Sequence, residues 1–172
     1  MRPAPAMTRR PLVTLLALLH LACALALVGV AAYDTFVTYP AWFAHIPESL
    51  EAAHRSNSGS VTARWFAWLG SGSIATAFAV AFAAWKQALP RNLVLASAAI
   101  VVLVYGVTAA YFEPLITILV RQGARMWTNE VLRGQARQFQ QINWIRLANV
   151  AGAALGLSLP AAIRLVRGDP GG

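Results

Sequence analysis

Four charged residues lie beside long apolar segments, where an unpaired charge is costly. Glu113 follows one such segment and Arg146 lies one turn inside the next. A charged side chain costs roughly 2.5 to 3.5 kcal/mol at the centre of a bilayer on insertion scales, and less near its edge. We therefore predict that Glu113 and Arg146 pair at matching depth. Asp34, at the end of the first apolar segment, and Arg64, at the start of the second, are expected to extend the pair into a polar ring.

His54 is the strongest candidate for acid–base chemistry beside this ring. A neutral imidazole at the mouth of a polar cavity can move a proton at neutral pH. In the catalytic interpretation His54 is the base, and Arg146 stabilises a developing phenolate or enolate oxygen. The substrate-binding residues would be Asp34, Glu113, Asn143 and Trp144. The alternative interpretation is a polar network that only fixes the positions of the helices.

A second group of residues has types that bind metals, namely His45, Glu48, Glu51 and His54. Glu51 and His54 share one helical face, as the Glu and His of di-iron bundles do, but those bundles use two such pairs and two further glutamates. The residue before Pro47 is disfavoured in a helix, which separates His45 from the others. We expect no metal and no cofactor.

Four apolar segments must position these residues. The chain is 58% hydrophobic and 12% charged, whereas soluble domains are about 45 to 50% apolar and about 25% charged. Residues 12–32, 65–85, 93–112 and 144–163 each reach the roughly 20 residues that cross a bilayer as a helix. The sequence predicts an all-α integral membrane four-helix bundle that forms a single domain over residues 1–172.

The first apolar segment follows Arg9 and Arg10, as a signal peptide would. Its apolar run exceeds the roughly 7 to 15 residues of a signal core, so we expect a retained helix. His20 lies in its middle, and an ionisable residue within a membrane is a functional candidate by default. The favoured interpretation is a neutral imidazole bonded to a backbone carbonyl.

Basic residues indicate the orientation of the four helices. Both tails and the short second connection would share one side of the membrane, and their basic residues are Arg2, Arg9, Arg10, Lys86, Arg91, Arg164 and Arg167. The positive-inside rule makes this side cytoplasmic. Thirteen of the fourteen basic residues are Arg, a weak sign of a bacterial protein, so the expected location is a bacterial inner membrane.

The two longer connections, on the opposite side, are each expected to hold a short helix. Pro47 suits the first position of one helix, with Glu48 and Glu51 near its positive end. The other helix covers residues 128–143, with Thr128 as the N-cap. Its apolar stripe consists of Leu132, Ala136, Phe139 and Ile142. This helix could lie on the membrane surface or continue the fourth apolar helix outward.

Two apolar segments carry a stripe of small residues at four-residue spacing. The stripe consists of Ala148, Gly152, Gly156 and Pro160 in the fourth segment, and of Gly72 and Thr76 in the second. Such spacing lets two helices approach closely. We expect packing within one bundle rather than dimerisation.

The net charge of +8 raises the question of nucleic acid. The basic residues cluster at the ends of the apolar segments, however, where anionic lipid headgroups explain them better. We expect the lipid bilayer as partner and no nucleic acid. The sequence also lacks a phosphate-binding loop, a dinucleotide fingerprint and a catalytic triad order.

Several short motifs support a family resemblance. They are Tyr39-Pro40-x-Trp42, Ile46-Pro47, Ala53-His54, Phe112-Glu113-Pro114 and Asn143-Trp144-Ile145-Arg146. The chain resembles the anthrone oxygenase-like family of small four-helix bacterial membrane proteins, most of which have no assigned activity. The resemblance implies a compact bundle and, for characterised members, oxidation of an anthrone to an anthraquinone without a known cofactor. It carries over His54, Asn143, Trp144 and Arg146 as pocket residues.

The leading hypothesis is a membrane protein that binds a small hydrophobic molecule in a polar pocket near its outer face; in the catalytic interpretation it also oxidises that molecule. An enzyme of this kind would be a cofactor-independent oxygenase, because a stabilised carbanion can react with oxygen directly. One alternative is a non-catalytic membrane component or partner subunit. Another is a small transporter, which the lack of an evident inverted repeat disfavours.

Overall fold

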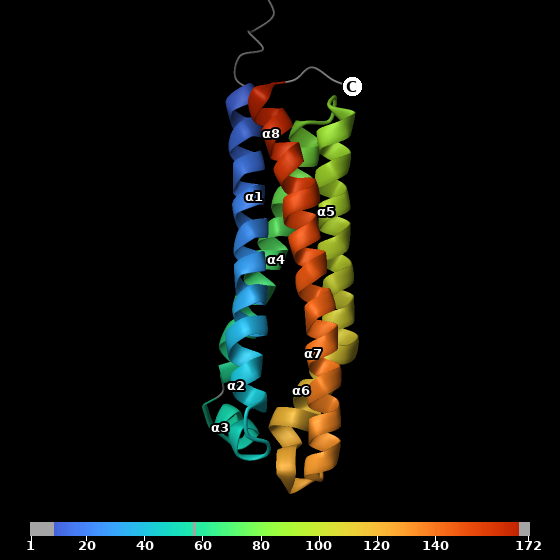
Figure 1. Ribbon diagram of the computed structural model, residues 1–172. Helices are drawn as coiled ribbons and strands as arrows, with labels where there is room; N and C mark the ends of the chain where they lie inside the picture. Colours follow the sequence, from blue (N-terminus) through green and yellow to red (C-terminus); the bar gives the residue numbers. More distant parts are fainter. Residues whose placement is uncertain (1–8, 57, 169–172) are drawn as a thin grey trace, which may run out of the picture.

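The computed structural model describes residues 9–56 and 58–168, and these form four long helical rods packed side by side (Figure 1). The first rod comprises α1 (Arg9–Tyr33), η2 (Asp34–Thr38) and α2 (Tyr39–Phe43). After the short α3 (Glu48–Ser56), the second rod is α4 (Ser58–Ala83). The third comprises α5 (Ala88–Val107), η3 (Thr108–Phe112), α6 (Glu113–Ile116) and η4 (Thr117–Gln122), followed by the single turn η5 (Gly123–Arg125). The fourth comprises α7 (Asn129–Ala151), η6 (Gly152–Ser158) and α8 (Leu159–Arg167).

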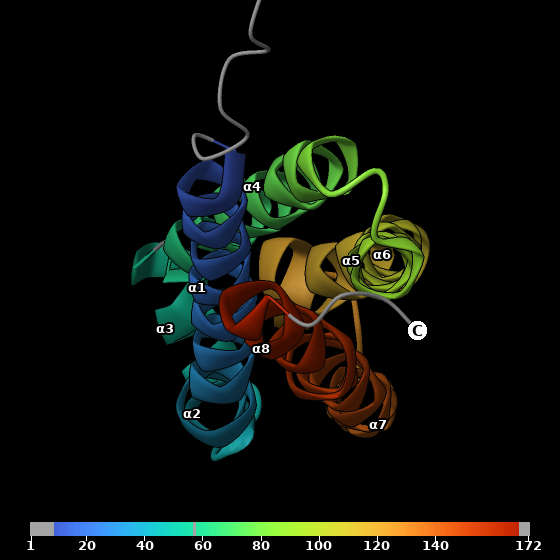
Figure 2. The ribbon, with the colours of Figure 1, turned by 90° about the horizontal axis from the view of Figure 1, so that it is seen from above.

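The rods close into a ring when viewed along the bundle (Figure 2). The first rod packs against α4, α4 against α5, and α5 against the fourth rod, which returns to α1. The described ends of the chain lie at the same end of the bundle (Figure 1). Arg2, used above to predict orientation, lies outside the described residues.

Four helices are long and apolar enough to cross a membrane, which confirms the predicted number. Three are longer than predicted, and the spans are Pro11–Phe43, Ala63–Ala83, Ala88–Gln122 and Asn129–Arg167. At 1.5 Å per residue, a helix of 35 residues is about 52 Å long, well beyond the roughly 30 Å of hydrocarbon. The expectation that the long helices end before the two longer connections is therefore wrong, because the helices continue into them.

Three prolines explain why these helices continue where we expected them to end. Pro40, Pro114 and Pro160 each lie two residues after a π-helical turn, namely η2, η3 and η6. Proline has no N–H to donate and its ring clashes with the carbonyl four residues earlier. A π turn inserts one extra residue, which relieves that clash, so the rod goes on past the proline.

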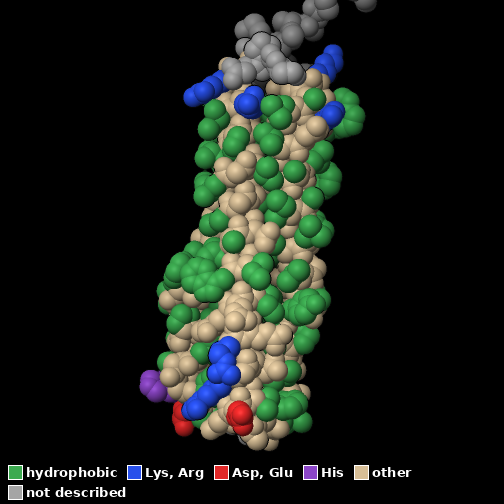
Figure 3. Space-filling model, turned by 45° about the vertical axis from the view of Figure 1, so that its right-hand side comes forward, with side chains coloured by type: hydrophobic (Ala, Val, Ile, Leu, Met, Phe, Trp, Pro, Cys, Tyr) green, Lys and Arg blue, Asp and Glu red, His purple; other side chains and the backbone are tan. Residues whose placement is uncertain are grey.

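On the face shown in Figure 3, apolar side chains are spread along the length of the bundle, and charged side chains gather at its two ends. Exposed aromatic residues mark the limits of the apolar belt. Trp85 lies near the end that holds the described chain ends, and Trp65, Trp68, Tyr111 and Trp144 lie toward the other. Tryptophan and tyrosine prefer the membrane–water interface.

Beyond this second set of aromatic residues the bundle carries a helical end cap, formed by residues 39–56, 113–125 and 129–142. Its core includes Trp42, Leu50, Leu119, Leu132 and Phe139. The predicted short helix after Pro47 is confirmed as α3, which begins at Glu48.

The predicted N-cap at Thr128 is also confirmed, because its hydroxyl accepts a hydrogen bond from the Val131 amide at 3.5 Å. The helix that follows continues straight into the fourth rod and buries Leu132 and Phe139 in the cap. The alternative of a helix lying on the membrane surface is therefore wrong.

The small-residue stripe of the fourth rod does not pack within the bundle, so that prediction is wrong. Gly152 and Gly156 are exposed, and a Cβ added to either would have no neighbour within 4 Å. The turn η6 places Ala153, Ala154 and Ser158 inside instead. The prediction holds for Gly72, where a Cβ would lie 3.6 Å from the Cys23 sulfur of α1.

Candidate functional site

A buried ion pair joins the first and fourth rods where the apolar belt meets the end cap. Arg146 Nη2 lies 3.4 Å from Asp34 Oδ2, and the two side chains are only 5% and 4% exposed. Tyr39 completes a triangle: its hydroxyl donates to Asp34 Oδ2 at 3.2 Å and accepts from Arg146 Nη2 at 3.3 Å. Burial of this pair is tolerable because hydrogen bonds accompany the Coulomb attraction.

The guanidinium of Arg146 also lies among aromatic rings. Its central carbon is 4.7 Å from the ring centre of Phe112, 4.9 Å from that of Phe66 and 5.9 Å from that of Tyr39. Aromatic faces attract a cation, most strongly where water is excluded. With Phe66 on α4 and Phe112 on η3, every long rod contributes a side chain to the surroundings of this charge.

The turn η2 positions the first rod's share of the site. Asp34 and Thr35 are adjacent in sequence and both buried, whereas Phe36 and Val37 are exposed. In a regular α-helix, successive side chains point about 100° apart, so few adjacent pairs both face inward. The wider π turn brings both polar side chains into the bundle.

Asn143 is fixed by Thr35 in a defined orientation. The Thr35 hydroxyl donates to the Ala31 carbonyl at 2.6 Å, so it must accept from Asn143, whose Nδ2 lies 2.7 Å away. This assigns the amide nitrogen to Thr35 and leaves Asn143 Oδ1 as the remaining acceptor. That oxygen is buried and has no hydrogen-bond partner among the described residues.

A hollow of about 250 Å³ lies beside Asn143, between the first rod and α7. Its lining residues are Thr35, Phe36, Tyr39, Pro40, Gln140, Asn143 and Trp144. Phe36 and Trp144 meet edge to face at 5.3 Å, and both side chains are exposed on the apolar belt. The hollow therefore combines an aromatic rim with polar groups of the buried network.

The predicted pair of Glu113 with Arg146 is wrong. Glu113 is 54% exposed and lies 3.5 Å from Arg121, at the surface of the end cap. The π turn η3 ends immediately before Glu113 and turns the buried Phe112 toward Arg146 in its place. Glu113 thus does not join the candidate site.

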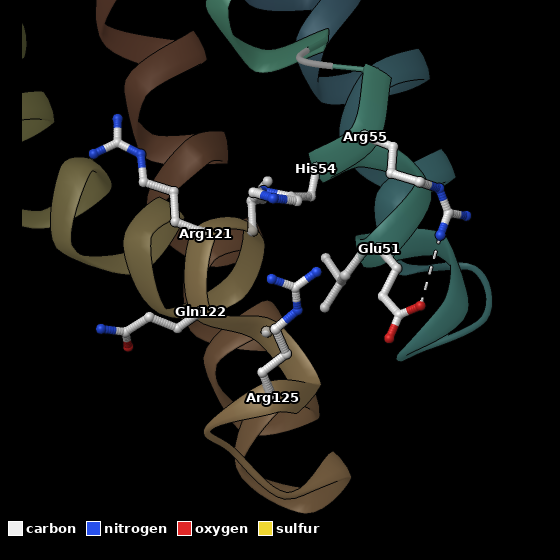
Figure 4. Close-up of a pocket in the computed structure, with 9 residues that line it drawn as sticks. Glu51, His54, Arg55, Arg121, Gln122 and Arg125 are labelled. Carbon is white, nitrogen blue, oxygen red and sulfur yellow. Dashed lines mark ion pairs between the residues drawn. The ribbon is translucent and has the colours of Figure 1, made fainter.

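His54 also lies away from Arg146. It is exposed on α3 and lines a separate cleft in the end cap with residues of η4 and η5 (Figure 4). Of the predicted site residues, the structure brings together Asp34, Asn143 and Arg146 and places Trp144 at the rim of the hollow. Within residues 9–56 and 58–168, no three His, Cys, Asp or Glu side chains gather as a metal site would require.

A second polar cluster lies deeper in the apolar belt, around His20. Its Nδ1 lies 3.1 Å from the Ser73 carbonyl oxygen, which confirms the predicted contact to a backbone carbonyl. Its Nε2 lies 2.9 Å from Ser158 Oγ, which is 2.8 Å from Ser97 Oγ. The geometry fits a neutral imidazole that donates from Nδ1 and accepts at Nε2. The cluster links all four rods.

Sequence reasoning missed Tyr39, Thr35 and Ser158 as members of these clusters. The sequence does carry a signal, because a proline follows each residue in an otherwise helical segment. Pro40 lies five residues after Thr35 and one after Tyr39, and Pro160 lies two after Ser158. Such a proline predicts a widened turn before it, and hence a shift in which residues face inward.

Comparison of the chain with protein-family models, curated proteins and solved structures gave no match.

Proposed function

We propose that this chain is a multi-pass protein of the bacterial inner membrane that binds a small hydrophobic molecule in the hollow beside Asn143. Asn143 Oδ1 carries the proposal: it is a buried acceptor without a partner among the described residues, on a side chain that lines the hollow. A buried acceptor left unbonded costs about 1 to 3 kcal/mol. A ligand with a hydroxyl or N–H donor would recover that cost.

The position of the hollow supports a ligand that arrives through the membrane. Its rim residues Phe36 and Trp144 are exposed at the level of the aromatic belt. A hydrophobic compound dissolved in lipid would meet this opening from the side. Small-molecule sites usually measure about 300 to 1,000 Å³, so a hollow of about 250 Å³ fits a small ring compound or one part of a larger one.

The orientation in the membrane belongs to the same proposal. The described chain ends and the basic residues Arg91, Arg164 and Arg167 lie at one end of the bundle. The positive-inside rule assigns that end to the cytoplasm. The hollow and the end cap then face the outer side.

The family resemblance extends the proposal to oxidation of an aromatic ligand of the anthrone type. The balanced step converts a methylene carbon and O₂ into a carbonyl carbon and one water molecule. The base must reach the hollow, which His54 does not. Tyr39 lines the hollow and touches the Asp34 carboxylate at 3.2 Å, so it is placed to pass the proton to Asp34. Arg146 would stabilise the anion formed nearby.

A ligand pair tests the binding proposal without changing the protein. Purified protein in lipid nanodiscs is titrated with a hydroxylated anthrone and with its O-methylated analogue. Loss of the donor should weaken binding by about tenfold, the effect of one buried hydrogen bond. Equal binding of the two compounds would refute the role assigned to the Asn143 acceptor.

Two variants on the same helix complete the test. Asn143→Leu should remove the preference for the hydroxylated compound. Asn149→Leu is the matched control, because Asn149 is exposed and its side chain bonds only to the Ile145 carbonyl among the described residues. Oxygen uptake measured with the hydroxylated compound, and its loss in Tyr39→Phe, tests oxidation separately from binding.

A purely structural role is the second candidate, and the linkage of all four rods around Arg146 favours it. In that case both compounds bind weakly and equally. Substitutions in the network would then change only the stability of the protein.

A further inference from the structure

A cleft in the end cap lies apart from the hollow, between α3 and the η4–η5 segment. Its volume is about 120 Å³, and its walls include the apolar side chains of Leu50 and Val120. His54 and Arg125 face this cleft from opposite walls (Figure 4). The proposed membrane ligand does not reach it, so the cleft needs an explanation of its own.

The cleft carries an excess of positive charge. Three arginines and one glutamate are among its lining residues. Arg55 pairs with Glu51 at 3.8 Å, and Arg121 pairs with Glu113 at 3.5 Å. Arg125 makes no ion pair within the described part of the chain, and its guanidinium points into the space between α3 and η4 (Figure 4). Arg125, the lining arginine that pairs with no carboxylate of the described residues, is therefore the one whose guanidinium faces the cleft.

We propose that this cleft binds a phosphate-sized oxyanion, with Arg125 as its main ligand and the His54 ring N–H as a second donor. The planar guanidinium presents paired N–H groups that match two oxygens of phosphate. An anion bound there would give Arg125 the negative partner that neither Glu51 nor Glu113 supplies. The volume of about 120 Å³ accommodates such a group and is far below that of the usual organic ligand site.

The height of the cleft above the membrane favours a soluble source for the anion. Arg121 lies ten residues beyond Tyr111 along one rod, which is about 15 Å at helical rise. The headgroup layer of one leaflet is only about 5 to 8 Å thick. A phosphate group in water, free or carried by a small metabolite, reaches the cleft more readily than the phosphate of a lipid does.

The test uses the full chain in nanodiscs of zwitterionic lipid, titrated with inorganic phosphate at constant ionic strength. Arg125→Gln should weaken binding by about tenfold or more, because a charge-assisted hydrogen bond is lost. Arg133→Gln is the matched control, since Arg133 is an exposed arginine of the end cap that does not line the cleft. Both side chains are exposed, so the unfolding midpoint should not change in either variant.

Two results would overturn the proposal. If phosphate does not bind, or if Arg125→Gln and Arg133→Gln weaken its binding equally, the cleft is not a phosphate site. Phosphate binding that is blocked in nanodiscs of phosphatidylglycerol would assign the cleft to a lipid headgroup and overturn the soluble source. Saturable binding in both lipids, lost only in Arg125→Gln, would support the site and its source.

Discussion

Replacing Arg146 by methionine should destabilise the protein by about 3 to 5 kcal/mol, the cost of removing one partner of a buried ion pair. Methionine retains most of the apolar volume between Phe66 and Phe112 but no charge. The Asp34 carboxylate, 4% exposed, would then lose the guanidinium that lies 3.4 Å away. Tyr39 would keep its hydrogen bond to Asp34, which limits the loss.

The contacts show where this cost arises. The two hydrogen bonds of Arg146 Nη2, at 3.4 and 3.3 Å, are long, and each ring contact contributes about 0.5 to 1 kcal/mol or more. A substantial part of the penalty is therefore the cost of a carboxylate left desolvated. Asp34→Asn removes that charge, so the double variant with Arg146→Met should recover about 2 kcal/mol relative to additivity.

Equilibrium unfolding of the full chain in mixed micelles, titrated with dodecyl sulfate, measures each free energy. A second cycle pairs Arg146→Met with Glu113→Gln, and its coupling should stay below about 0.5 kcal/mol because Glu113 is exposed and contacts Arg121. The two cycles share one substitution and differ only in the carboxylate. A coupling larger with Glu113 than with Asp34 would refute the pairing described above.

Three further substitutions test other parts of the bundle. His20→Leu should lower the free energy of unfolding by about 1 to 2 kcal/mol, because its hydrogen bonds join three rods; unchanged stability would contradict the His20 cluster. Gly70→Ala should cost about 1 to 3 kcal/mol, since the added methyl would overlap the Tyr105 hydroxyl, which donates to two carbonyls of α4. Thr128→Ala should cost about 1 kcal/mol at the start of α7, measured by amide hydrogen exchange, and Thr128→Ser should largely preserve protection.

Composition and segment length were sufficient to predict four long apolar helices. A bilayer requires about 20 mostly apolar residues whose backbone groups bond within the segment, and both properties can be read from sequence. The short helix after Pro47 and the cap at Thr128 could also be predicted, since local hydrogen bonding and the fixed φ of proline decide them. The ends of the long helices could not. Glu113-Pro114 reads as a helix end, yet the third rod continues to Gln122.

The partner of Arg146 could not be predicted for the same reason. By their depth along the helices, Glu113 and Asp34 could each pair with Arg146. Only the direction of each side chain decides which of them does. One extra residue in a turn rotates everything after it by about 100°. In the third rod, this rotation turns Glu113 away from the site and leaves Phe112 facing Arg146. In the first rod, the π turn lets Asp34 and Thr35 both face into the bundle.

The layers of the bundle favour the proposed binding function over transport. His20 and Asp34 are fourteen residues apart on the first rod, or about 21 Å along its axis. Between these levels the core contains Leu27, Val101, Val104 and Val150, all buried and apolar. A polar solute moving from one cluster to the other would have to cross this layer without a hydrogen-bonding partner, which costs several kcal/mol. The proposed ligand, dissolved in the membrane, would avoid this barrier by entering the hollow from the side, past Phe36 and Trp144.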